Sequence, residues 1–134
     1  MDDLIHPVMG SADETVFDGG FLASFRGNHR LEIGKTIPGV RMFVRTQTGS
    51  IYKIEIIDPA KREVEVRRIL PKNGSKHFGS AQRCLLRGAV CNKDPRAPRA
   101  PGWIVQGLPM EFWGVKSAES EVVITSPVER FFLD

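Results

Sequence analysis

Cysteine, histidine and long apolar runs are all scarce in this sequence of 134 residues. The two cysteines, Cys84 and Cys91, are separated by six residues, and the three histidines are scattered along the chain. A structural zinc site requires four ligands, with pairs only a few residues apart, so we expect no metal site. We expect two free thiols, buried in or beside a strand. A disulfide across a chain reversal at Gly88 is the alternative, which a reducing compartment disfavours.

No apolar run approaches the roughly 18 residues that a membrane-spanning helix needs, and the chain starts with the acidic sequence Met1-Asp2-Asp3. These features predict a cytoplasmic protein without a membrane partner. The length is that of one domain, which can bury a core without help from a metal or a disulfide. An apolar fraction of 41% and a charged fraction of 26% are typical of a globular protein.

Catalytic and cofactor-binding motifs are also missing. The glycine-containing segment 73–80 lacks the Gly-Lys-Ser/Thr end of a phosphate-binding P-loop. Neither His29 nor His77 lies at a recognisable spacing from a nucleophile and an orienting acid. Glu63 and Glu65 alternate onto the outer side of a predicted strand, where water would solvate them. We therefore predict a protein that is not an enzyme and carries no cofactor.

Hydrophobic alternation with a period of two is the strongest signal that the sequence does contain. Tyr52, Ile54 and Ile56 fall on one face of the chain, while Lys53 and Glu55 fall on the other. The pattern resumes after a turn that contains an Asp-Pro pair. Half-buried antiparallel strands have this period. We expect the core to contain Tyr52, Ile54, Ile56, Val64, Val66 and Trp103.

Similar patterns predict nine strands, separated by turns that are rich in Gly, Pro, Asn and Asp. The predicted strands cover residues 31–33, 40–46, 50–57, 63–70, 82–87, 103–105, 110–115, 121–125 and 128–132. Short strands without a long helical pattern favour an all-β fold. We predict a single small antiparallel β-barrel, or a tightly packed sandwich, over residues 31–134.

Charge is segregated along the chain. Residues 1–25 carry five acids and no Lys or Arg, which gives −5, whereas residues 26–99 carry 17 Lys or Arg against six acids, which gives +11. Residues 100–134 have a net charge of −3. A basic surface attracts nucleic acid or an acidic protein. The same cations can also serve as the solvated face or the charged edges of a sheet.

Residues 1–30 are predicted to form an acidic N-terminal arm, separate from the barrel. Phe17, Phe21 and Phe25 recur every four residues, as on one face of a helix, but Gly19-Gly20 sits between them. The arm is therefore expected to be irregular or partly helical. Its negative charge would draw it toward the basic part of the chain, where it would compete with anionic partners.

The candidate binding residues are cations and one aromatic residue. Phe43 lies between Arg41 and Arg45 on a predicted sheet face, as in barrels that stack bases and contact phosphates. The proposed ligand- or polyanion-binding residues are Arg26, Arg30, Arg41, Phe43, Arg45, Arg67, Arg96 and Arg99. The sequence favours an adaptor or regulatory module that holds an acidic protein partner. Nucleic acid is the alternative partner, and the oligomeric state stays open.

Segment 92–102 contains three prolines and three cations, so we expect an extended, exposed loop that does not join the sheet. It supplies two of the candidate residues, Arg96 and Arg99. Loops on a rigid scaffold often carry binding function, although a solubilising linker has the same composition.

Arg26 and Arg30 form an Arg-x-x-x-Arg pair in front of a predicted strand, which resembles a motif of the PilZ barrels. In that family two guanidiniums hold the phosphates and guanine edges of a cyclic dinucleotide, and a second motif, Asp/Asn-x-Ser-x-x-Gly, completes the site. The nearest match here runs from Asn73 to Gly79, and its final Gly comes one position late. A cyclic-dinucleotide sensor is therefore a further alternative for the function.

Three stretches resemble a group of small uncharacterised bacterial all-β proteins. They are Thr-Gly-Ser-Ile-Tyr-Lys-Ile-Glu-Ile-Ile-Asp-Pro at 48–59, Gly-Trp-Ile-Val-Gln-Gly-Leu-Pro-Met-Glu-Phe-Trp at 102–113 and Val-Val-Ile-Thr-Ser-Pro-Val at 122–128. The resemblance covers about residues 40–133. It implies a β-barrel and no activity, because none is established for that group.

Overall fold

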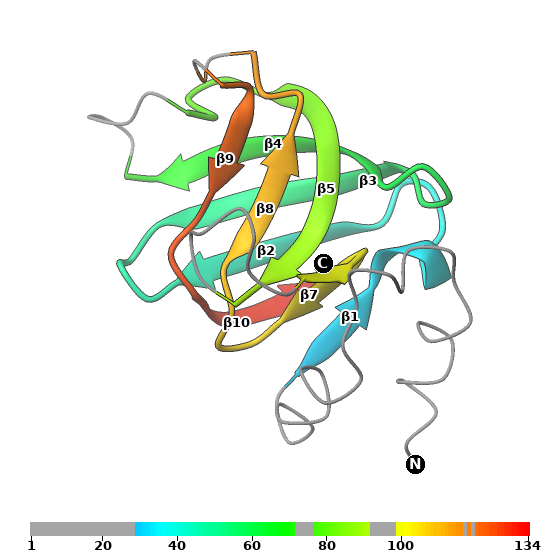
Figure 1. Ribbon diagram of the computed structural model, residues 1–134, viewed down its shortest axis with the longest axis horizontal. Coiled ribbons are helices and arrows are strands. Elements are labelled where there is room, and N and C mark those ends of the chain that lie inside the picture. Colours follow the sequence, from blue (N-terminus) through cyan, green and yellow to red (C-terminus); the bar gives the residue numbers. More distant parts are fainter. Residues whose placement is uncertain (1–28, 72–76, 92–98, 117, 119) are drawn as a thin grey trace.

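The computed structural model describes residues 29–71, 77–91, 99–116, 118 and 120–134 (Figure 1). The regular structure of these residues consists of strands and one short 3-10 helix, η2 (Ile33–Lys35). The strands are β1 (Arg30–Glu32), β2 (Arg41–Thr46), β3 (Ile51–Asp58), β4 (Glu63–Leu70), β5 (Gln82–Val90), β6 (Arg99–Pro101), β7 (Trp103–Val105), β8 (Met110–Trp113), β9 (Val122–Ile124) and β10 (Val128–Leu133). The prediction of an all-β fold is confirmed. Most of the predicted N-terminal arm, residues 1–28, lies outside the described residues.

One large antiparallel sheet contains eight of the strands. Its order is β10-β2-β3-β4-β5-β8-β9, and β6 pairs with β5 beside this path. A second, two-stranded sheet pairs β1 with β7. No ladder among the described residues joins β9 to β10, so the closed barrel stays a prediction. Each of the nine predicted strands has a counterpart in the structure, with bounds that agree to within a few residues.

Strong curvature in β5 folds the large sheet over its own core. Figure 1 shows β5 bending in front of the sheet, so that β8 and β9 lie across β2, β3 and β4. The bend includes Gly88, whose φ of 138° is one that other residues rarely adopt. A Cβ at Gly88 would lie only 2.2 Å from the carbonyl oxygen of Ala100. The predicted reversal at Gly88 is wrong, because glycine lets the strand bend and continue to Val90.

The predicted exposed loop at 92–102 is also wrong at its C-terminal end, which forms β6 and pairs with β5. In β6, Ala100 and Pro101 are buried and pair with Ala89 and Gly88. A proline removes one N–H donor from a ladder, but the next residue, Gly102, donates its N–H to Arg87 O at 2.8 Å. The ladder therefore tolerates Pro101. Residues 92–98, with the candidate Arg96, lie outside the described residues.

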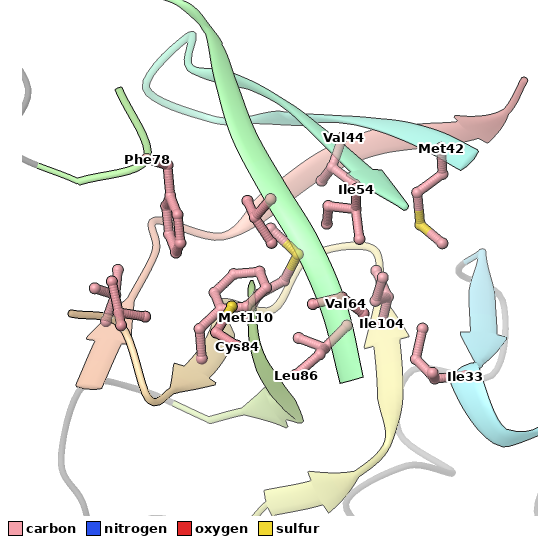
Figure 2. Packing of buried hydrophobic residues seen from close by; sticks show 14 of the residues in the cluster. Ile33, Met42, Val44, Ile54, Val64, Phe78, Cys84, Leu86, Ile104 and Met110 are labelled. Atoms are coloured by element: carbon pink, nitrogen blue, oxygen red, sulfur yellow. The ribbon is translucent and has the colours of Figure 1, made fainter. Parts of the chain in front are cut away.

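The core fills the space between the two layers of the folded sheet. Figure 2 shows Ile54 and Val64 there, together with Leu86 and Met110 from the covering layer. Of the predicted core residues, Ile54, Ile56, Val64, Val66 and Trp103 are fully buried. Tyr52 is only partly buried, at the edge of the core, where its ring packs edge-on against Phe78 with centroids 5.9 Å apart. Trp103 belongs to a second, smaller cluster with Ala89, Ala100, Val105 and Leu108.

Both cysteines are free, as predicted, but only one of them is buried. Cys84 points into the core, and burial raises the pKa of its thiol to about 12. Cys91 is exposed just after the end of β5. The prediction that both thiols are buried is wrong for Cys91, because β5 ends before it.

Candidate functional site

Strand alternation gives the β10-β2-β3-β4 part of the sheet an outer face, opposite the core. In β2, Met42 and Val44 point into the core, so Arg41, Phe43 and Arg45 point outward. Pairing brings outward side chains of the neighbouring strands beside them. The outer face contains Arg41, Phe43, Arg45, Ile51, Lys53, Glu55, Glu65, Arg67, Ile69, Arg130 and Phe132.

An open groove of about 400 Å³, here called the outer groove, crosses this face. It is lined by Phe43, Arg45, Ile51, Ile69, Arg130 and Phe132. The register places Phe132 opposite Phe43 and Arg130 opposite Arg45. The two phenyl rings have centroids 5.8 Å apart and are tilted by 32°. The groove therefore combines an apolar floor with two guanidinium groups.

Ion pairs on the outer face leave part of its positive charge unmatched. Arg45 pairs with Glu129 at 2.9 Å, and Arg41 pairs with Asp134 at 3.3 Å. All four side chains are about half exposed, so each pair contributes only about 1 kcal/mol or less. Arg130, by contrast, forms no ion pair with any residue that the structure describes. Within the described part of the chain, the groove thus keeps one positive charge without an ion-pair partner.

Charge also changes sign along β3 and β4. Lys53 lies directly opposite Arg67, and Glu55 lies directly opposite Glu65, so like charges face each other across the ladder. A small hollow of about 160 Å³ is lined by these four side chains and Ala81. The cationic pair lies on the side of the outer groove, and the carboxylates lie farther along the strands. The face as a whole carries both signs of charge.

The structure brings four of the predicted site residues onto this face. Phe43 and Arg45 line the outer groove, Arg67 lines the neighbouring hollow, and Arg41 lies farther along β2. Arg30 lies in the two-stranded sheet, opposite Val105 in β7. Arg26 and Arg96 lie outside the described residues.

Arg99 lies in a different cluster, around the buried carboxylate of Glu111. Its Nε donates to Glu111 Oε1 at 2.6 Å, and Trp113 Nε1 donates to Glu111 Oε2 at 2.9 Å. Arg87 stacks over the Trp113 ring, with its guanidinium carbon 4.4 Å from the centroid. Burial raises the pKa of Glu111, but these hydrogen bonds and the charges of Arg99 and Arg87 outweigh it and hold the pKa below its usual value. This cluster ties β6 to β8.

Sequence reasoning missed Arg130, Phe132, Ile51 and Ile69 as groove residues. Because residues 100–134 have a net negative charge, the charge pattern did not point to the two outward residues of β10 as part of a basic surface. Alternation along β10 could have placed Arg130 and Phe132 on one face. Nothing local in the sequence shows that β10 pairs with β2.

Comparison with known proteins identifies no relative by sequence family or by structure. No protein-family model matches the chain, and no solved structure matches it. The resemblance to small bacterial all-β proteins therefore stays a prediction. Within the described ranges, no three His, Cys, Asp or Glu side chains gather in a group that could hold a metal ion. The described part of the chain also has no helix of the length and apolarity needed to cross a membrane.

Proposed function

We propose that this protein is a non-catalytic binding module, of the adaptor or regulatory kind, whose outer groove holds a segment of an acidic partner protein. The segment would place apolar side chains on Phe43 and Phe132 and a carboxylate against Arg130. The free thiols of Cys84 and Cys91 agree with a reducing compartment such as the cytoplasm.

The exposed aromatic ring of Phe132 carries this proposal. It is 61% exposed, although it lies in an ordered strand and contacts a second phenyl ring. Covering such a side chain gains about 1.5–3 kcal/mol, and aromatic residues with a neighbouring Arg are frequent hot spots of interfaces. The groove has room for several side chains of a partner.

Mixed charge on the outer face favours a protein over nucleic acid. The carboxylates of Glu55 and Glu65 share the face with Lys53 and Arg67, and Glu129 offsets Arg45. A phosphate backbone would be repelled by these carboxylates along part of its path. A short segment with one or two acids needs only the cationic end of the face.

Selection from a displayed library of random peptides tests the proposal. The wild-type protein should enrich peptides that combine Asp or Glu with apolar residues. Phe132→Ala should weaken binding of these peptides at least about tenfold, since it removes a principal contact. Ile37→Ala is the matched control, because Ile37 is 68% exposed on the connection before β2 and should not affect binding. Enriched peptides without acids, or equal binding by the Phe132→Ala variant, would contradict the proposal.

Nucleic acid remains the second candidate, because Phe43 and Phe132, with Arg45 and Arg130 beside them, could also stack bases. Titration with a single-stranded oligonucleotide at several salt concentrations separates the two functions. Contacts with phosphates would make the logarithm of the affinity fall steeply with the logarithm of the salt concentration. Weak binding without this slope would remove the nucleic-acid function. The cyclic-dinucleotide alternative depends on Arg26, outside the described residues, and a titration with a cyclic dinucleotide tests it directly.

A further inference from the structure

Arg68 is a buried cation that holds together the end of β4 and the chain that follows it. It is only 6% exposed and lies on the core side of β4, two residues after Val66. Its Nε donates to Pro71 O at 2.8 Å, and its Nη1 donates to His77 O. The Arg68 backbone N–H donates to Phe78 O at 2.6 Å.

Among the residues that the structure describes, the positive charge of Arg68 has no negative partner. Arg68 forms no ion pair with any residue in the described part of the chain, and its two acceptors are neutral carbonyl groups. Burial of an ion without a counter-charge is unfavourable, and buried charges in proteins are usually paired. The third guanidinium nitrogen, Nη2, has no hydrogen-bond acceptor among the described residues. A negatively charged ligand at Nη2 would remove much of this cost.

Arg68 borders a hollow of about 360 Å³ at the edge of β4. The hollow is lined by Arg67, Arg68, Ile69 and Gly79. Gly79 lies beside this nitrogen, since a Cβ built at Gly79 would be 3.8 Å from Arg68 Nη2. Arg67 also forms no ion pair with the residues that the structure describes. Two guanidinium groups without carboxylate partners therefore border one accessible space.

We propose that this hollow, the Arg67–Arg68 hollow, is a binding site for a phosphate group. Two guanidiniums carry a charge of about +2, and a phosphate monoester carries about −1.5 to −2 at pH 7. A carboxylate would neutralise only half of that charge. Guanidinium groups also match the geometry of phosphate oxygens, with two parallel N–H donors each. The site is distinct from the outer groove, although Ile69 lines both.

Titration of the full-length, ¹⁵N-labelled protein with inorganic phosphate tests this site, with sodium chloride used to hold the ionic strength constant. Amide resonances of residues 67–69 and Gly79 should shift and saturate with phosphate. The same titration with acetate should not give saturating shifts. Equal shifts with acetate, or no saturation with phosphate, would overturn the proposal.

Variants connect the shifts to the two arginines. Arg67→Gln should weaken phosphate binding about tenfold, because it removes one of the two charges. It leaves the hydrogen bonds of Arg68 to Pro71 O and His77 O intact. Arg83→Gln is the matched control, since Arg83 is an exposed cation of β5 that does not line the hollow, and it should change the affinity less than twofold. An Arg67→Gln variant that binds phosphate as well as the wild type would refute the site.

A further titration with phosphoserine distinguishes the source of the phosphate group. Saturating shifts with both phosphoserine and inorganic phosphate would assign the hollow to a phosphate ester. Shifts with inorganic phosphate alone would assign it to the free ion. Because these experiments need neither Phe132 nor a peptide, their failure would leave the proposal for the outer groove standing.

Discussion

Phe132 lies against Phe43 on the outer face, with ring centroids 5.8 Å apart. The two residues nevertheless come from β10 and β2, the last and the first strand of the large sheet in sequence order. The pair exists because β10 is the neighbour of β2 in the sheet. The same ladder places Arg130 beside Arg45. Both proposed sites, the outer groove and the Arg67–Arg68 hollow, therefore lie along β2, β3, β4 and β10.

Truncation of a core side chain should destabilise the protein strongly. Ile54 is fully buried between the layers, so Ile54→Ala should lower the free energy of unfolding by about 2–4 kcal/mol, through lost burial and the cavity that remains. Urea unfolding monitored by circular dichroism measures this loss. Ile37→Ala removes the same atoms from a side chain that is 68% exposed and should cost less than about 1 kcal/mol. Equal losses in the two variants would show that the register of β3 is incorrect.

Gly88→Ala should be among the most destabilising single substitutions in the chain. Its φ of 138° strains any side chain, and the new Cβ would collide with Ala100 O. We expect a loss of at least about 3 kcal/mol, because β6 must move away from β5. Gly34→Ala is the control, since a Cβ there would meet no atom within 4 Å. A urea midpoint for Gly88→Ala close to that of Gly34→Ala would show that β5 does not bend in this way.

Glu111 should make stability depend on pH. Because its pKa is lower in the folded chain than in the unfolded chain, the ionised form stabilises the fold above the unfolded value of about 4.3. This contribution is lost as the pH falls through the lower, folded pKa. Glu111→Gln should therefore cost about 3 kcal/mol at pH 7, where it removes the carboxylate that Arg99 binds, and progressively less below pH 4.

Urea unfolding of the wild type and the Glu111→Gln variant between pH 2.5 and 7 gives this difference directly. The comparison is needed because Glu32 acts in the opposite direction, since burial raises its pKa despite the nearby charges of Lys35 and Arg62. The effect of Glu32 is common to both proteins and cancels in the difference. A difference that stays constant over the whole pH range would rule out ionised Glu111 as its source.

The two thiols should react at very different rates. Cys91 is exposed, whereas Cys84 is buried and its pKa is raised to about 12, so little thiolate forms there at pH 8. A disulfide reagent such as DTNB should label one thiol rapidly in the folded protein and two in urea. Cys91→Ser should abolish the rapid phase. A rapid phase that survives in this variant would mean that Cys84 is accessible.

Local patterns in the sequence determined most of the strands and one turn in detail. Alternation placed Ile54, Ile56, Val64 and Val66 in the core, because successive side chains of a strand point to opposite sides. The turn between β3 and β4 forms where the Asp-Pro pair predicted it, and Asp58 Oδ1 accepts a hydrogen bond from the backbone N–H of Lys61 at 3.2 Å. These features depend only on residues that are close in the sequence.

Tertiary structure alone decided which outward residues share a surface. Alternation assigns Phe43 and Phe132 to a face of their own strands, but only the pairing of β10 with β2 makes one groove of them. In the same way, the bend at Gly88 brings β6 onto β5, so that Arg99, predicted as a loop cation, becomes the partner of the buried Glu111. Strand pairing and burial are set by packing between segments distant in the sequence, and the local period of a strand carries no information about its neighbours.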